Sequence, residues 1–119
     1  MTGETGYNIV FYETQRGSRP ALEFIEALLS PAQAKIARWL GQLAVHGPDL
    51  HRPMSDVLSG SIRELRIGYG GNNYRLLYFF FERTVVITNG FVKKTHSVAH
   101  GEIARSERRR ADWLSRRPL

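Results

Sequence analysis

The sequence contains no cysteine and no long apolar run. Without cysteine the chain makes no disulfide and offers no thiolate to a metal, which favours a reducing compartment, and we expect the cytoplasm. The longest apolar run spans only residues 76–81, whereas a membrane-spanning helix needs about 20 apolar residues. Residues 1–6 lack the basic start and the apolar stretch of a secretory signal. We therefore expect a protein that is neither exported nor inserted in a membrane.

Acidic residues are scarce relative to basic ones. The 119 residues include 11 Asp and Glu but 17 Lys and Arg, which gives a formal net charge of +6 at pH 7. This excess favours a polyanionic partner, and nucleic acid is the commonest one for a basic domain, although the charge can also serve solubility alone. The length fits a single domain that covers residues 1–119.

Motifs for nucleotide hydrolysis and for metal binding are also missing. No glycine-rich loop is followed by the Lys and Ser or Thr of a phosphate-binding loop. Two histidine pairs, His46 with His51 and His96 with His100, have no carboxylate at a recognised ligand spacing. We expect neither a metal nor a small-molecule cofactor.

The first half of the chain predicts one strand and two helices. Residues 7–12 are rich in β-forming side chains and predict a strand. Apolar residues at helical spacing predict helices over 18–29 and 30–46, each with a proline in its first turn, and the Ser-Pro corner between them suggests a helical hairpin. A Gly-Pro pair ends the second helix, and we expect a polar loop over residues 47–58.

The second half predicts a β-meander and a last helix. Apolar residues alternate over 62–69, 74–81 and 85–93, and short turns join these three strands, so we expect them to be antiparallel. A polar, Arg-rich helix follows from residue 99 to the end. The predicted fold is α+β, with a small antiparallel sheet of about four strands, an N-terminal helical hairpin on one face and a C-terminal helix. The other face of the sheet is left for function.

Charged side chains occupy the strands on that other face. Because strand side chains alternate, Glu64 and Arg66 share a face, and we place Arg75 on it as well. A buried unpaired guanidinium is costly, so Arg75 needs a carboxylate partner, and Glu64 is the candidate. With ordinary strand register, Arg66, Arg75 and the pair Lys93–Lys94 converge from three neighbouring strands.

Aromatic residues accompany this predicted cluster. Regular alternation places Phe91 and Lys93 of the last strand on the same side as Ile87. A cationic cluster can hold RNA phosphates, and Phe91, Tyr69 or Tyr74 can stack on bases.

The same cluster can cleave a phosphodiester bond. When the ribose 2′-hydroxyl attacks its own phosphate, fixed Arg or Lys side chains stabilise the charge that builds on the phosphate oxygens. Glu64 is a candidate general base, and a lysine or His100 is a candidate acid for the leaving 5′-oxygen. The alternative is that Glu64 and Arg66 form an ordinary surface pair and that the lysines are a solvated strand end.

Three sequence strings carry a resemblance to a known family. They are IRELRI at 62–67, YRLLYF at 74–79 and NGFVKKT at 89–95, and residues 24–25 and 102–104 agree with them. Together these strings resemble the phage-related, HigB-like branch of the RelE/ParE toxin superfamily, over nearly the whole chain. The resemblance implies a microbial-ribonuclease-like fold and a toxin of a type II toxin-antitoxin system. It also implies a metal-independent endoribonuclease that cuts mRNA in the ribosomal A site and arrests translation, and a helix-turn-helix antitoxin (HigA-like) encoded nearby.

The resemblance assigns roles by position. Arg66 corresponds to a basic residue of the second strand, Arg75 to a catalytic arginine, and Lys94 with Lys93 to the basic residue that ends the last strand. Glu64 stands where other branches often carry a lysine. His100 lies near a tyrosine that some members use for catalysis.

Two rival functions remain beside this hypothesis. If the chain is a ribosome-dependent nuclease, Phe91 stacks on a base, the last helix contacts ribosomal RNA through Arg105, Arg108 and Arg109, and Arg75→Ala loses toxicity without a change in folding. A ParE-like gyrase poison shares the fold but needs no phosphate-stabilising cluster. An inactive RNA- or protein-binding toxin homologue is the second rival, because Glu64 and His100 depart from the family pattern.

Overall fold

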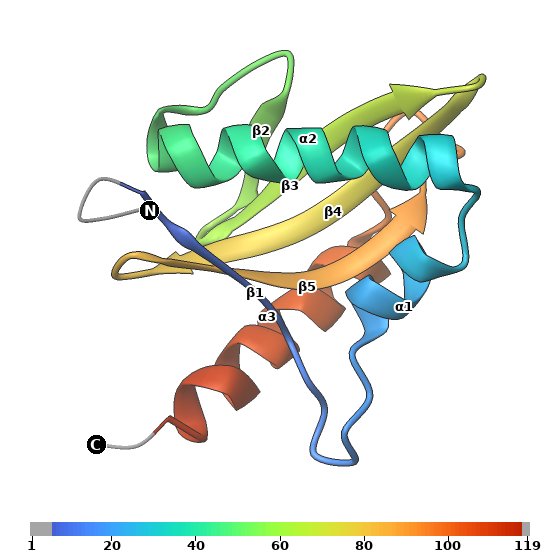
Figure 1. The fold of residues 1–119 in the computed structure, drawn as a ribbon. Coiled ribbons are helices and arrows are strands. Elements are labelled where there is room, and N and C mark those ends of the chain that lie inside the picture. The colour runs from blue at the N-terminus through green and yellow to red at the C-terminus, as the bar shows by residue number, and fades with distance from the viewer. Residues whose placement is uncertain (1–5, 118–119) are drawn as a thin grey trace.

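The computed structural model describes residues 6–117, which form a mixed five-stranded sheet with helices on both faces (Figure 1). The elements in chain order are β1 (Asn8–Phe11), α1 (Pro20–Glu26), α2 (Ser30–His46), the 3-10 helix η1 (Gly47–Asp49), β2 (Ser55–Ser59), β3 (Ile62–Tyr69), β4 (Asn72–Phe81), β5 (Thr84–Val92) and α3 (His100–Ser115). The strand order is β1-β5-β4-β3-β2; β1 runs parallel to β5, and the other neighbours are antiparallel. The predicted α+β class is confirmed, with one strand more than expected, but the prediction of an antiparallel sheet was wrong for β1, which is parallel to β5.

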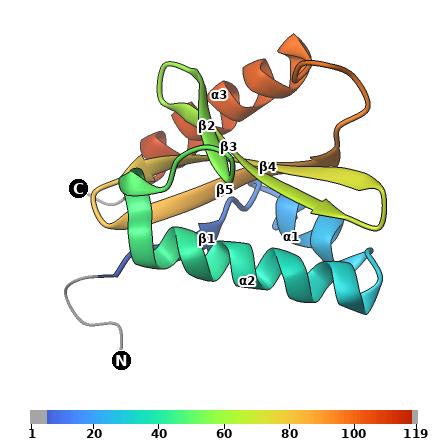
Figure 2. The same ribbon diagram turned by 90° about the horizontal axis from the view of Figure 1, so that it is seen from above.

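The two faces of the sheet carry different helices (Figure 2). α1 and α2 lie on one face, which we call the α1/α2 face, and α3 lies on the other, the α3 face. The prediction that the second face is uncovered is wrong for the part that α3 covers. Trp113 of α3 packs edge-on against Phe79 and Phe81, so the few apolar residues of α3 meet a second apolar patch on the sheet.

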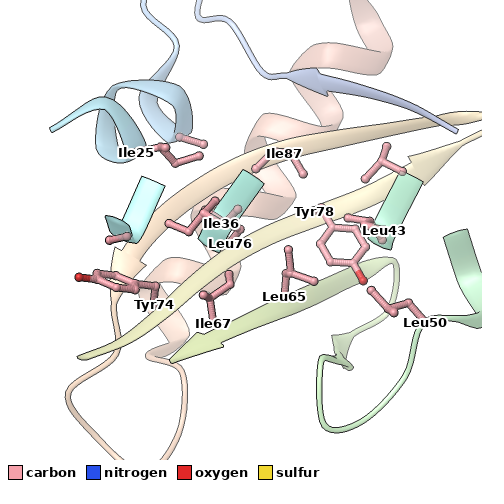
Figure 3. Close-up of a cluster of buried hydrophobic side chains, with 13 residues drawn as sticks. Ile25, Ile36, Leu43, Leu50, Leu65, Ile67, Tyr74, Leu76, Tyr78 and Ile87 are labelled. Carbon is pink, nitrogen blue, oxygen red and sulfur yellow. The ribbon is translucent and has the colours of Figure 1, made fainter. Parts of the chain in front are cut away.

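The main core lies between the sheet and the α1/α2 helices (Figure 3). Ile36 and Leu43 of α2 are fully buried in it. A Cβ added to Gly90 would lie 2.6 Å from the ring of Phe24, so α1 can approach β5 this closely only because residue 90 is glycine. The buried side chains that β3 and β4 contribute alternate along each strand as predicted, and they include Leu65, Ile67, Leu76 and Tyr78; β5 adds Ile87.

α1 is shorter than the helix predicted over 18–29. A helix that continued through Pro31 would set the proline ring against the carbonyl group of Ala27 and would lose a hydrogen bond, so the chain breaks between α1 and α2. Gln33 Nε2 donates hydrogen bonds to the backbone oxygens of Glu26 and Leu28, at 3.1 and 2.8 Å. These bonds fill acceptors that the interrupted helix leaves open.

The predicted loop over 47–58 contains η1 and most of β2. The loop prediction was wrong for β2, because Ser55-Asp56-Val57-Leu58 lacks the alternation of a half-buried strand, and only pairing with β3 makes it extended. β2 forms one edge of the sheet, and its Asp56 pairs with Glu64 of β3.

Candidate nucleic-acid interface

A β-bulge in β5 changes which side chains reach the α3 face. Tyr78 of β4 pairs with Ile87, but the residue just before it, Leu77, pairs with Asn89. Thr88 is therefore an extra residue in β5. A bulge of this kind shifts the alternation of every residue that follows it.

The bulge therefore corrects the predicted placement of Phe91 and Lys93. Ile87 belongs to the main core on the α1/α2 face, whereas Phe91 lies directly across from Arg75 and packs on the second apolar patch. Lys93 follows two residues later, and its backbone N–H donates to the oxygen of Asn73 at 2.7 Å. Phe91 and Lys93 thus share the α3 face with Arg75 and do not share the face of Ile87.

Polar side chains of α3 hold the bulge in place. Ser106 Oγ and Thr88 Oγ1 are 2.5 Å apart in the buried interface. Asn89 Nδ2 donates to the backbone oxygen and to Oε1 of Glu102, each at 3.0 Å. Arg109 Nη1 donates to the backbone oxygen of Thr88 at 2.9 Å and to Oδ1 of Asn89 at 3.2 Å. The extra residue of β5 is thus an anchor for α3.

Arg109 also takes part in this anchor. Burial lowers the pKa of Arg109, and the nearby Arg105 acts in the same direction. Both hydrogen bonds of Arg109 Nη1 are made to β5, while its side chain also lines a hollow with Arg105 and Arg108. Arg105 and Arg108 are exposed, and Arg105 Nη1 lies 3.0 Å from Glu102 Oε1.

Two arginines face each other across β3 and β4 with a carboxylate between them. Arg66 pairs directly with Arg75. Glu64 Oε2 lies 2.8 Å from Arg66 Nε, and Glu64 Oε1 lies 3.1 Å from Arg75 Nε, where the N–H of Arg75 is not aligned for a hydrogen bond. Glu64 is only 3% exposed and Arg75 only 9% exposed. The carboxylate partner that the sequence required for Arg75 is present.

Asp56 completes this set of charges. Its Oδ2 lies 3.1 Å from Arg66 Nη2 and 2.8 Å from Arg52 Nη2. The hydrogen bond from Arg52 lowers the pKa of Asp56. Sequence reasoning missed Asp56 because its strand was predicted as a loop. We call Asp56, Glu64, Arg66 and Arg75 the four-charge cluster; its formal charges cancel.

Burial opposes the positive charge of Arg75. It lowers the pKa of this guanidinium, and the attraction to Glu64 opposes that effect. Arg75 Nη1 also donates to the backbone oxygen of Tyr74 at 3.1 Å. Arg75 is therefore held rigidly beneath the surface, while the Arg66 side chain is 32% exposed.

α3 leaves one end of its face open, next to the turn between β3 and β4. The row of paired residues under α3 is buried and consists of Glu64, Leu77 and Asn89. The next row consists of Arg66, Arg75 and Phe91, of which Arg75 is buried and the other two are half-buried. The last row consists of Gly68, Asn73 and Lys93, of which Gly68 and Asn73 are exposed. We call these two rows the open strip; its residues are Arg66, Arg75, Phe91, Gly68, Asn73 and Lys93.

A hollow of about 380 Å³ adjoins the open strip. It is lined by Asn73, Lys93, Lys94, Thr95 and His96. Two ammonium groups and several hydrogen-bonding groups make it suited to an anion such as a phosphate.

Outside the open strip lie four predicted residues, of which Lys94 lines the adjoining hollow. Lys94 follows the end of β5 and His100 begins α3; both are exposed, and within residues 6–117 neither makes an ion pair with the four-charge cluster. Tyr74 is buried on the α1/α2 face, where its ring packs edge-on against Phe24 with centroids 6.1 Å apart. Its predicted stacking on a base is therefore wrong. Tyr69 is exposed, but it alternates with Gly68 and does not belong to the α3 face.

Two further properties concern the described part of the chain, residues 6–117. No three His, Asp or Glu side chains in it come together as a metal site requires. None of its helices is both long and apolar enough to cross a membrane.

Comparison with known proteins adds the family. The family model described as phage derived protein Gp49-like (DUF891) matches residues 23–111, from α1 into α3, and this span contains the whole open strip. No curated protein matches the chain significantly. The Gp49-like family is a family of RelE/ParE-like toxins, which implies an antitoxin partner. Because the match covers most of the sequence, the chain belongs to the phage-derived Gp49-like family of RelE/ParE-like toxins.

Proposed function

We propose that this protein is a RelE-type toxin of the HigB-like branch, which cuts mRNA in the ribosomal A site. Its inhibitor would be a helix-turn-helix antitoxin. The observation that carries the proposal is the open strip: an exposed arginine and an aromatic ring flank a buried ion pair, and basic side chains follow at the strip's end. A gyrase poison would have no use for this arrangement.

Arg66 is the side chain that would hold the scissile phosphate. Its Nε is directed at Glu64 and its Nη2 at Asp56, so the guanidinium is oriented before RNA arrives. Nη1 makes no hydrogen bond or ion pair with any of residues 6–117 and is free for a phosphate oxygen. A donor held in place in this way stabilises developing negative charge without a reorganisation cost.

Glu64 would be a positioning residue and not the general base. Both of its oxygens face a guanidinium, and its burial keeps a ribose 2′-hydroxyl away from it. Arg75, held by Glu64, would add a positive field beneath the phosphate. Phe91, next to Arg75, would stack on a base and fix the ribose for in-line attack.

The reaction would use the RNA's own nucleophile. The 2′-oxygen attacks phosphorus and loses its proton to a solvent base, the bond from phosphorus to the 5′-oxygen breaks, and a 2′,3′-cyclic phosphate and a 5′-hydroxyl form. Lys93 lies on the same face as Arg66 and is the candidate donor of the proton to the leaving oxygen. Lys94, His100, Arg105 and Arg108 would meet flanking RNA.

The test is to induce the chain alone in bacterial cells and to map the 5′ ends of two messages that differ only in a start codon. We expect growth arrest and new ends within codons of the translated message only. Equal cutting of both messages would contradict ribosome dependence. Gyrase-linked DNA breaks without mRNA ends would favour the ParE-like alternative, and growth without arrest would favour an inactive homologue.

A further inference from the structure

We propose that the outer edge of β1, with the groove beside it, binds an extended acidic segment of a partner protein. The inference deepens the proposed function, because the partner of such a toxin is its inhibitor. The surface lies at the opposite edge of the sheet from β2 and is made of residues that the proposed cleavage does not use.

The groove lies between β1 and the end of α3. β1 is an edge strand of the sheet (Figure 1), and the lining of the groove takes residues from β1 and from the end of α3. The groove has a volume of about 630 Å³, and Val10, which is 36% exposed, presents an apolar side chain there. Its lining residues are Ile9, Val10, Phe11, Glu13, Arg19, Trp113, Arg116 and Arg117.

The main chain of β1 has unused pairing groups on this side. Asn8 N–H donates to the oxygen of Arg83 at 2.8 Å, and Tyr12 N–H donates to the oxygen of Ile87 at 2.9 Å, so even-numbered residues of β1 face β5. Ile9 and Phe11 therefore direct their N–H and C=O groups away from β5, and no other described strand takes them up. An added strand can bond to these groups.

The two edges of the sheet differ in how they are protected. β2 carries a charged residue, Asp56, paired with Arg52, and a register shift between Val57 and Ser59 breaks its regular edge. β1 has neither a charged residue nor a proline among Asn8–Phe11, and its pairing with β5 is regular. Natural proteins protect free edges against pairing, so an unprotected edge beside a groove indicates a docking strand.

The charges around the groove favour an acidic occupant. Arg19 Nε lies 3.0 Å from Glu13 Oε1, and Arg116 Nη2 lies 2.7 Å from Asp112 Oδ2. Arg117 has no carboxylate partner among residues 6–117, and its guanidinium lies 3.9 Å from the ring centroid of Phe81. A second copy of this chain would bring another net charge of +6, which disfavours self-pairing.

The experiment measures binding of the full chain to a short labelled peptide of alternating glutamate and valine. We expect saturable binding, slowed amide exchange at Ile9 and Phe11, and at least about tenfold weaker binding of Val10→Glu and of Arg117→Glu. The matched controls are Val57→Glu, at the 53% exposed valine of the other edge strand, and Arg38→Glu on α2; both should bind as the unmodified chain does.

Three results would overturn the inference. They are unchanged binding by Val10→Glu and Arg117→Glu, protection that appears on β2 in place of β1, and displacement of the peptide by single-stranded RNA. The assay uses no mRNA cleavage, so a chain that cuts no RNA can still bind the peptide, and a chain that binds no peptide can still cut RNA. The two proposals therefore fail separately.

Discussion

At the scale of single residues, the contact of Glu64 with two arginines decides how the site behaves. Arg66 and Arg75 are direct cross-strand neighbours, and two positive charges in that position repel each other. Glu64 offsets this repulsion because one of its oxygens faces each guanidinium. Removal of Glu64 or of Arg75, which are both buried, therefore affects both folding and chemistry.

Arg75→Ala is expected to destabilise the fold, whereas the sequence alone led us to expect unchanged folding. The substitution leaves Glu64 buried with only Arg66 as partner, and we expect a loss of about 2 kcal/mol in the free energy of unfolding. Urea denaturation measures it. In the matched double variant Glu64→Gln/Arg75→Ala no buried carboxylate remains, so its loss should be smaller than the sum of the two single losses. If the loss in the double variant equals the sum of the two single losses, Glu64 and Arg75 are not coupled.

Asp56→Asn is expected to tighten RNA binding. Asp56 competes with a phosphate for Arg66 Nη2, and the amide removes this competing charge at nearly constant shape. We expect about threefold tighter binding to a single-stranded RNA oligonucleotide at low salt, as measured by fluorescence anisotropy. Asp49→Asn, on exposed η1, is the control for the change in net charge. Equal effects of the two variants would show that net charge alone acts.

Sequence alone predicted the partner of Arg75 but not the complete cluster. Alternation in β3 and a need for charge compensation identified Glu64, because both are local rules. Asp56 belongs to a strand whose conformation depends on pairing with β3, so no local pattern reveals it. Tyr74 alternates with Arg75 and so faces the helices, where Phe24 closes over its ring.

At the scale of elements, the docking of α3 on the sheet shapes the interface. Its first half anchors the bulge at Thr88, and near its end Tyr12 Oη donates to Asp112 Oδ2 at 2.5 Å. By covering the buried part of its face, α3 defines where the open strip begins. Sequence predicted the helix, but its apolar residues were too few to indicate which face it covers.

Tyr12→Phe is expected to loosen α3. The variant keeps the ring in the apolar patch and removes only the hydroxyl that contacts Asp112. We expect a decrease in Tm of about 5 °C and faster amide exchange in the last turns of α3. Tyr69→Phe, at an exposed tyrosine, is the matched control. An unchanged Tm and unchanged exchange would mean that the hydroxyl contributes nothing to docking.

The same contact predicts how stability depends on pH. The hydrogen bond from Tyr12 lowers the pKa of Asp112, so this contribution is present above the ordinary value of 3.8 and is lost as pH falls through the lower folded value. Burial and then the bond to Asp112 raise the pKa of Tyr12, so its contribution is present below 10.0 and is lost at higher pH. In Tyr12→Phe the free energy of unfolding should depend less on pH, both at acidic and at alkaline pH. An unchanged pH profile would contradict this.

The bulge at Thr88 is the element-level feature that sequence reasoning could not supply. Thr88-Asn89 continues an alternating strand pattern as far as Gly90, and the contacts with Ser106 and Arg109 favour an extra residue there. Strict alternation would have sent Phe91 and Lys93 to the wrong face.

At the scale of the whole molecule, the sheet separates three tasks. The α1/α2 face holds the main core, the open strip presents Arg66 and Phe91, and the edge at β1 remains free for a partner. The net charge of +6 favours approach to a polyanion such as RNA, and that attraction should weaken as salt increases. Composition and alternation predicted the class of fold and the basic character, since neither depends on long-range contacts.

The most direct test of the central claim is the rate of mRNA cleavage by the purified chain on ribosomes stalled at a defined codon. Arg66→Ala should fold like the unmodified protein and cleave about 100-fold more slowly, because the oriented donor to the phosphate is lost. Arg38→Ala, on the exposed side of α2, should cleave at the unmodified rate. Cleavage by Arg66→Ala as fast as by the unmodified chain would contradict the assignment of the open strip as the site of RNA cleavage.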